Sequence, residues 1–355
     1  MSGLVARTLF RATIVLALFS LNLPVAAAKL QTVDFAAVKA GVGPLFAAGP
    51  ETIKVVVKDE RPEPDVLYCT LGGMYGLFGG ETPTKPEMVP AAMEEDAREA
   101  VEILGFKPGD GHTLEITVKD VRIDVPVRKN AFGAANFIGF ARIDTALKGP
   151  DGAVLASKSF RLASWISMVE GKWPIPYMYA RFLWEAVART LLPQFPRDPS
   201  SEAVTAVLAR LGTLKDDTER TNLITWLGLL GKPAPGVIEK LQQIFRTEED
   251  QTLYETAALS LARLATPEVR DELLAVAART KVLKEWDPGD AEEGWTLTYA
   301  LHLMEIPDLK ARAPRLTRDP ERQTQLYSFL ETGEPPRRPE KLERKLAEAR
   351  EKLKK

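Results

Sequence analysis

The chain has almost none of the residues that usually carry disulfide or metal chemistry. It contains one cysteine, Cys69, and two histidines, His112 and His302, among 355 residues. A single cysteine excludes a disulfide within the chain, so stability must come from core packing. Neither histidine lies near the cysteine in the sequence, which almost excludes a zinc site of the His/Cys type. We therefore expect no bound metal and no cofactor.

Sequence motifs of the common enzyme classes are also missing. The chain has no G-x-S-x-G, no S-x-x-K and no H-E-x-x-H. The acidic segment 287–293 lacks the glycine position and the distant glutamate of a calcium loop. With 47 basic and 49 acidic residues the net charge is −2, so no strong field attracts nucleic acid. We expect a non-enzymatic protein that has no catalytic residues and binds no nucleic acid.

The first 28 residues have the order of a secretory signal. Arg7 and Arg11 precede an apolar centre at 13–19, and small residues follow at 26–28. The apolar centre is too short for a bilayer of ~30 Å, which takes ~20 residues, so cleavage is expected after Ala28. An uncleaved anchor is the alternative. The sequence predicts a signal peptide at 1–28, export to the bacterial periplasm or exterior, and no integral membrane segment after cleavage.

Residues 29–196 have the mixed pattern of an α+β domain. Strands are expected at 53–58, 114–125, 137–147 and 153–165, and helices at 86–106 and 177–192. The alternation in the second strand changes phase at Lys119–Asp120, which predicts a bulge. Pro150-Asp151-Gly152 predicts a tight turn and an antiparallel hairpin. Together these elements predict a four-stranded, mainly antiparallel sheet with two helices on one face.

Three prolines between residues 193 and 199 indicate a boundary, after which the strand pattern stops. Similar leucine-rich segments end successive apolar helices at residues 211, 230, 264 and 304, with offsets of 19, 34 and 40 residues. Such periods are typical of an α-solenoid, and the region resembles HEAT-type repeats, with unrelated helix hairpins as the alternative. We expect an all-α HEAT-like solenoid at 197–333 and a charged amphipathic helix at 334–355, and we expect the two halves to stay folded when cut between Arg197 and Glu202.

The N-terminal half resembles small α/β domains of envelope lipoproteins, including auxiliary components of bacterial lipid-transport systems. The likeness is carried by the first strand, Ile53 to Asp59, by the helix end at Leu104-Gly105-Phe106, and by the strand 114–118. Those proteins carry a lipidated cysteine, which the segment 21–25 replaces here. The resemblance implies a fold more than a role.

Two apolar segments are candidates for contact with a ligand or a partner. The glycine-rich segment 72–80 has apolar side chains without regular periodicity, which suits a flap over a pocket or partner. The segment 165–184 is rich in aromatic residues of the kind enriched at interfaces. Packing within the domain is the alternative for both segments. The candidate residues are Met74, Tyr75, Leu77, Phe78, Trp173, Tyr177 and Tyr179.

The sequence alone favours an exported adaptor or scaffold that binds another protein through its helical-repeat surface. Solenoids present extended surfaces that suit protein recognition, and catalytic motifs are missing. The alternative is a periplasmic carrier or binding protein for an apolar ligand, such as a lipid, held in the N-terminal domain under the glycine-rich segment. The two hypotheses differ in the partner, which is a protein in the first and a small molecule in the second.

Overall fold

The structure is a computed structural model of the chain. The structure describes residues 31–32, 38–61, 69–71, 84–85, 89–125, 136–167, 175–279, 294–305, 320–335 and 344. The predicted signal peptide and the glycine-rich segment 72–80 lie outside these residues. The predicted helix at 334–355 also lies outside them, except for residues 334, 335 and 344.

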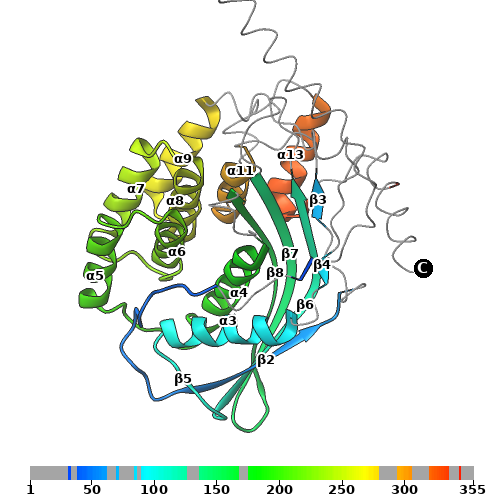
Figure 1. The fold of residues 1–355 in the computed structure, drawn as a ribbon, viewed down its shortest axis with the longest axis vertical. Coiled ribbons are helices and arrows are strands. Elements are labelled where there is room, and N and C mark those ends of the chain that lie inside the picture. The colour runs from blue at the N-terminus through cyan, green and yellow to red at the C-terminus, as the bar shows by residue number, and fades with distance from the viewer. Residues whose placement is uncertain are drawn as a thin grey trace, which may run out of the picture.

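Four long strands build the central sheet, in the order β2 (Thr52–Asp59), β6 (His112–Val125), β7 (Asn136–Lys148) and β8 (Val154–Ser167). β2 runs parallel to β6, whereas β7 is antiparallel to both β6 and β8. The predicted four-stranded, mainly antiparallel sheet is thus confirmed for its long strands (Figure 1). Short strands extend it: β5 (Lys107–Pro108) pairs with β2, and β3 (Cys69–Leu71) pairs with β6. β1 (Gln31–Thr32) and β4 (Thr84–Lys85) form a separate two-stranded sheet.

Local sequence signals account for the shape of the long strands. The register of β6 against β7 shifts between Val118 and Asp120, which confirms the predicted bulge. The β7–β8 hairpin closes through a hydrogen bond of 2.8 Å from the amide of Gly149 to the carbonyl of Ala153. Gly152 adopts a φ of +81°, which a glycine reaches without steric cost. The turn therefore sets the pairing of β7 with β8.

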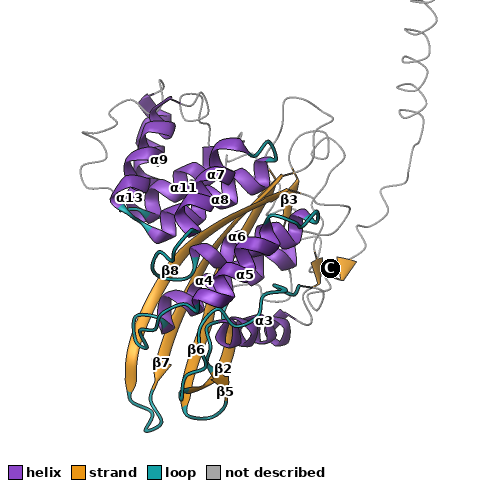
Figure 2. Ribbon diagram, turned by 90° about the vertical axis from the view of Figure 1, so that its left-hand side faces the viewer, coloured by secondary structure: helices purple, strands orange, loops and turns teal. Residues whose placement is uncertain are grey.

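Helices α3 (Val89–Ile103) and α4 (Ile175–Leu191) cover one face of the sheet (Figure 2). The apolar faces predicted for both helices are buried, and the long strands contribute the facing side chains. The hydroxyls of Thr145 in β7 and Thr190 in α4 form a buried hydrogen bond of 2.8 Å. The opposite face of the sheet is polar around Glu115, which pairs there with both Lys58 and Lys148. At this end the sheet is buried on one face and polar on the other.

The predicted helical region follows the sheet domain, and its helices form two layers. The inner helices are α6 (Asp217–Gly228), α8 (Gln251–Leu264) and α11 (Gly294–Leu303), which pack against one another in sequence order. Helices α5 (Ser201–Leu211), α7 (Val237–Thr247) and α9 (Pro267–Arg279) pack on them from the other side. Ser200, Asp216 and Asp250 cap α5, α6 and α8 by accepting a backbone N–H.

The inner helices pack onto the sheet domain through α4. Trp184 of α4 and Trp226 of α6 are fully buried, with ring centroids 5.4 Å apart. One continuous cluster of buried residues includes side chains from the sheet, from α4 and from the inner helices. Cutting the chain between Arg197 and Glu202, which we expect to leave both halves folded, would expose on each half the surface that is buried between α4 and the inner helices. No helix in the described ranges combines the length and apolar character needed to cross a membrane.

Helix α13 (Pro320–Thr332) packs on the other face of the sheet. A side chain at Gly139 would meet Met178 and Phe182 of α4, so the next residue, Phe140, points the opposite way. Phe140 contacts Phe329 of α13 edge-on, with ring centroids 6.2 Å apart. Arg161 of β8 also bonds Glu334, just beyond α13, over 2.7 Å. Helix α13 and Glu334 thus contact β7 and β8 on the face of the sheet opposite α4.

The close approach of α6 to α8 gives a testable result for Gly228→Ala. An added Cβ at Gly228 would lie 2.5 Å from the Cα of Ser260, whose hydroxyl donates to the carbonyl of Ile224 over 2.8 Å. Because the atom in the way is backbone, the helices must separate, and overpacking of this kind costs about 1–3 kcal/mol. Urea unfolding followed by circular dichroism measures the loss.

The matched control is Gly212→Ala, at the C-terminal end of α5. Gly212 has a φ of −74°, and an added Cβ there would lie 3.4 Å from the nearest atom, the carbonyl oxygen of Ala209. This variant is expected to stay within about 0.5 kcal/mol of the parent protein. Equal unfolding midpoints for the two variants would contradict the close approach of α6 and α8.

Candidate functional site

The structure describes only two of the candidate contact residues predicted from sequence. Met74, Tyr75, Leu77, Phe78 and Trp173 lie outside the described residues. Tyr177 is half-buried on α4, and Tyr179 is buried, with 2% of its surface exposed. The hydroxyl of Tyr179 accepts a hydrogen bond of 2.9 Å from Nη1 of Arg61, which also pairs with Asp59 at the end of β2. Tyr179 thus joins α4 to β2 in the core, and burial raises its pKa.

A cavity of about 500 Å³ lies where the sheet domain meets the helical region. Its walls come from β8, from the end of α4 and the segment after it, from the end of α6 and from α8 and α11. We call it the junction cavity. Its apolar lining consists mainly of leucine and proline side chains: Leu192, Pro193, Pro196, Leu229, Leu230 and Leu303.

The polar lining of the junction cavity is strongly basic. It contains five basic side chains and a single acidic one, Glu185. The basic residues are Lys158, Arg189, Arg197, Lys232 and Arg263. Among the described residues that line the cavity there is no histidine, cysteine, serine or threonine.

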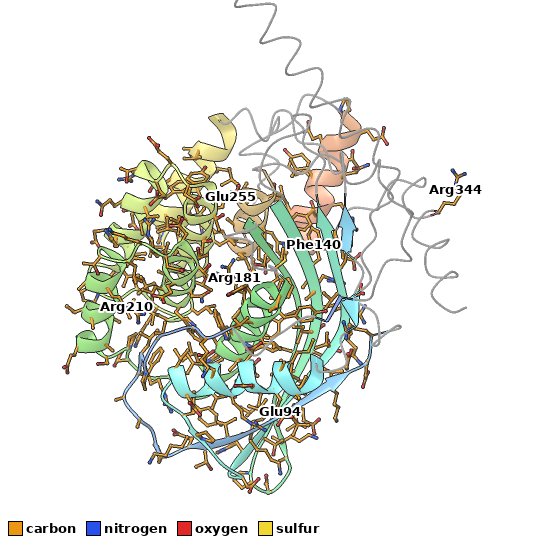
Figure 3. The ribbon with its side chains drawn as sticks, viewed as in Figure 1. Glu94, Phe140, Arg181, Arg210, Glu255 and Arg344 are labelled. Carbon is orange, nitrogen blue, oxygen red and sulfur yellow. The ribbon has the colours of Figure 1, made fainter. Side chains whose placement is uncertain are left out.

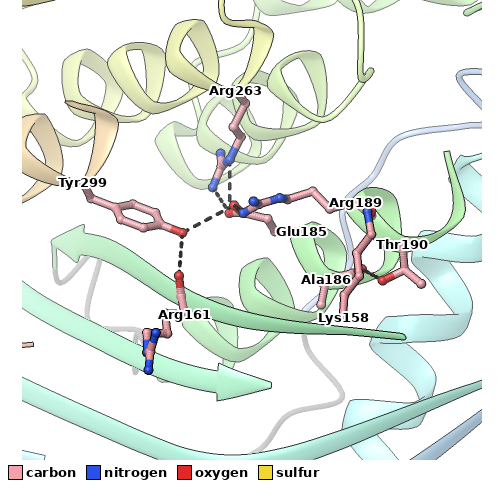
Figure 4. Close-up of polar contacts among 8 residues, drawn as sticks. All are labelled: Lys158, Arg161, Glu185, Ala186, Arg189, Thr190, Arg263 and Tyr299. Atoms are coloured by element: carbon pink, nitrogen blue, oxygen red, sulfur yellow. Dashed lines mark hydrogen bonds and ion pairs between the residues drawn. The ribbon is translucent and has the colours of Figure 1, made fainter. Parts of the chain in front are cut away.

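Glu185 is the centre of the charged wall, and Figure 4 shows its contacts. Only 1% of its surface is exposed. Its carboxylate accepts hydrogen bonds from Nε of Arg263 over 3.1 Å, from Nη1 of Arg189 over 3.1 Å, and from the hydroxyl of Tyr299 over 3.4 Å. Burial by itself raises the pKa of Glu185, but the two guanidinium groups outweigh it and hold the pKa below its ordinary value. One carboxylate therefore ties α4 to α8 and α11.

A further buried arginine lies one turn before Glu185 on α4. Arg181 is 5% exposed, and Figure 3 places it where α4 faces the inner helices. Burial and the nearby charge of Arg263 lower its pKa to about 9. The wall behind the junction cavity is therefore crowded with positive charge.

Lys158 and Arg189 lie together at the side of the cavity formed by β8 and α4. Nζ of Lys158 donates a hydrogen bond of 2.8 Å to the carbonyl of Arg189 in the last turn of α4. The guanidinium of Arg189 stands 5.0 Å above the ring of Phe160. Burial, and then the charge of Arg189, lower the pKa of Lys158.

The other two cations of the lining have carboxylate partners of their own. Arg197 pairs with Glu51 over 2.6 Å and stacks on Phe106, with its guanidinium carbon 3.8 Å from the ring centroid. Lys232 pairs with the exposed Asp198. Glu185 is thus shared by Arg189 and Arg263, while Lys158 donates to the carbonyl of Arg189.

The histidines lie away from the junction cavity. The ring of His112 packs edge-on against Phe195 at 5.1 Å, and Nδ1 of His302 hydrogen-bonds the carbonyl of Leu330 over 2.9 Å. In the described part of the chain, no group of three histidine, cysteine, aspartate or glutamate side chains has the arrangement of a metal site.

About 45% of the chain matches a solved structure. It is the crystal structure of protein XCC0632 from Xanthomonas campestris, described as DUF330, and the match covers 90% of that protein. The identity is 12% and the TM-score is 0.29, so no functional argument rests on this likeness. No family model matches the chain. A search of curated proteins found no match.

Proposed function

We propose that this protein is a non-enzymatic binding protein that holds a small, partly apolar molecule in the junction cavity. The observation that carries the proposal is the cavity itself: about 500 Å³, open on one side, and lined by leucine and proline beside a few charged groups. Ligand sites in proteins have this size and this mixture of apolar walls with a few convergent polar groups.

This proposal develops the carrier hypothesis and moves its site. The sequence pointed to the N-terminal domain under the segment 72–80, whereas the junction cavity uses β8 and α4 together with the helical region. We further propose that the two-layered helices act as HEAT-like repeats whose inner layer supplies one wall of the cavity. Export to the periplasm or exterior, and an adaptor role for the remaining repeat surface, stay predictions.

Filling the cavity tests the proposal. Leu192 is half-buried on the cavity wall, so Leu192→Trp is expected to occupy the site without disturbing the core. Decanol is the probe, with binding followed by displacement of an environment-sensitive apolar dye. We expect Leu192→Trp to weaken decanol binding about tenfold, which corresponds to roughly 1.4 kcal/mol.

Leu208→Trp is the control, because Leu208 is equally half-buried but lies on α5, outside the cavity lining. Its affinity for decanol should equal that of the parent protein. A parent protein that binds no apolar probe at all would overturn the proposed function, and equal weakening in both variants would place binding elsewhere.

A further inference from the structure

We infer that the molecule held in the junction cavity carries an oxyanion, a carboxylate or a phosphate, which binds at Lys158 and Arg189 while its apolar part lies against the leucines. This inference rests on the proposed function and names the chemical class of its ligand. Lys158 lies on β8 and Arg189 on α4, whereas Leu229 and Leu230 follow the end of α6. These two basic groups and these two leucines therefore come from different elements.

The charge on the β8–α4 wall is not balanced. Lys158, Arg189 and Arg263 bring three positive charges to the lining, and Glu185 brings one negative charge, which leaves an excess of two. No carboxylate in the described ranges forms an ion pair with Lys158. The exposed Glu305, outside the lining, adds a weaker attraction to Arg189 that water screens. An anion in the cavity would compensate the remaining charge.

Hydrogen-bond donors on this wall also outnumber the acceptors they meet. An ammonium group has three N–H donors, and the structure uses one of those of Lys158, on the carbonyl of Arg189. A guanidinium has five, and Arg189 uses Nη1 on Glu185 while 41% of its side-chain surface remains exposed. A carboxylate or phosphate can offer two oxygen acceptors to the planar guanidinium of an arginine, which binds both groups well. Lowered hydration of Lys158, which lies partly buried beside Arg189, strengthens such an interaction.

The ends of four helices at the cavity work against an anion. α4, α6, α8 and α11 all terminate there, and a helix C-terminus carries about −0.5 of an elementary charge. Their total of about −2 would offset the excess of two positive charges only if the terminal carbonyls were all left without hydrogen bonds. Several of the last carbonyls are also already hydrogen-bonded, among them Arg189 by Lys158, Thr225 by Leu229 and Leu261 by Ala265. The wall therefore stays net positive and donor-rich.

Matched probes of equal chain length test the inference on the intact protein. Decanoate and decyl phosphate carry the two oxyanions, decanol is the neutral counterpart, decyltrimethylammonium the cationic one, and inorganic phosphate lacks the chain. Calorimetric titration should show decanoate or decyl phosphate binding about tenfold more tightly than decanol, as expected for a hydrogen bond to a charged group. The better of the two distinguishes a carboxylate from a phosphate ligand.

Lys158→Gln should weaken decanoate binding about tenfold and leave decanol binding unchanged. Lys158→Arg keeps the charge and should restore most of it. Lys148→Gln is the control, because Lys148 lies on the opposite face of the sheet, where its partner Glu115 keeps Lys58.

If decanol or decyltrimethylammonium binds as tightly as decanoate, the inference fails while the proposed function stands. If inorganic phosphate matches decyl phosphate, the apolar part is not recognised and the inference also fails. If no probe binds, both fail.

Discussion

Replacing Glu185 by glutamine is expected to lower the free energy of unfolding by about 3 kcal/mol, because it leaves the buried guanidinium of Arg263 without its counter-charge. Side-chain exposure is 2% for Glu185 and 7% for Arg263, so water cannot take over the lost interaction. Arg189 loses less, since 41% of its side chain is exposed. The expected cost therefore lies at the lower end of the range for a broken buried ion pair. Urea unfolding followed by tryptophan fluorescence gives the value.

The pH dependence of the same variant supplies a second readout. The folded-state pKa of Glu185 lies below its ordinary value of 4.5, so the ion pair stabilises the protein above that pH and its contribution is lost as the pH falls through the folded-state pKa. The difference between the parent protein and Glu185→Gln should thus shrink in acid. Glu219→Gln is the control, because Glu219 and its partner Arg210 are each 44% exposed, and such a pair contributes about 0–1 kcal/mol. Equal losses in the two variants would contradict the structural role of Glu185.

Replacing Asp96 by asparagine is expected to stabilise the protein at neutral and alkaline pH. Asp96 of α3 is 3% exposed, and its Oδ2 has no hydrogen-bond partner in the described part of the chain. Burial, and then the charges of Glu99 and Glu95, raise its pKa from 3.8 to about 8. Because the pKa is raised, the protonated form of Asp96 is the one that stabilises the fold. Its contribution to stability is complete below pH 3.8 and is lost progressively as the pH rises towards 8.

The size of this effect follows from the shift. At pH 7 the folded protein has lost about 4 kcal/mol relative to acid, at roughly 1.4 kcal/mol for each pH unit above the unfolded pKa. The asparagine amide brings its own unsatisfied donors at a cost of about 1–3 kcal/mol. We therefore expect no gain at pH 4 and a gain of about 2 kcal/mol at pH 8. Unfolding titrations across this range test it.

Asp110→Asn is the matched control for Asp96→Asn, since the side chain of Asp110 is 86% exposed. Its stability relative to the parent protein should not change with pH beyond a few tenths of a kcal/mol. If the stability of Asp96→Asn keeps the pH dependence of the parent protein, Asp96 is ionised in the fold and its burial is compensated in some other way.

Much of the fold could be predicted because its signals are local. The spacing of Met93, Ala97, Ala100 and Leu104 identified the buried face of α3, and all four are buried. The phase change at Lys119–Asp120 located the bulge, and the Pro-Asp-Gly turn located the hairpin. Each of these patterns depends on residues a few positions apart, which is why they can be interpreted without knowing what the element packs against.

The candidate site could not be predicted, because its members meet only in the folded chain. Glu185 and Arg263 are 78 residues apart, and in the sequence Arg263 is only part of a leucine-rich helix end. One signal was present: Glu185 is the single acidic residue of α4, on a helix that is otherwise mainly apolar. A lone carboxylate in such a helix indicates a buried partner, but not which of the chain's 47 basic residues supplies it.

The sequence by itself determined which segments form strands and helices and which faces of them are buried, because hydrophobic periodicity and turn residues act over short distances. The tertiary structure alone decided that the inner helices pack onto α4, with Trp184 against Trp226, and that α13 covers the opposite face of the sheet. It also created the junction cavity. An apolar stripe specifies that a face must be covered, and only the shape and charge of the assembled elements specify by what.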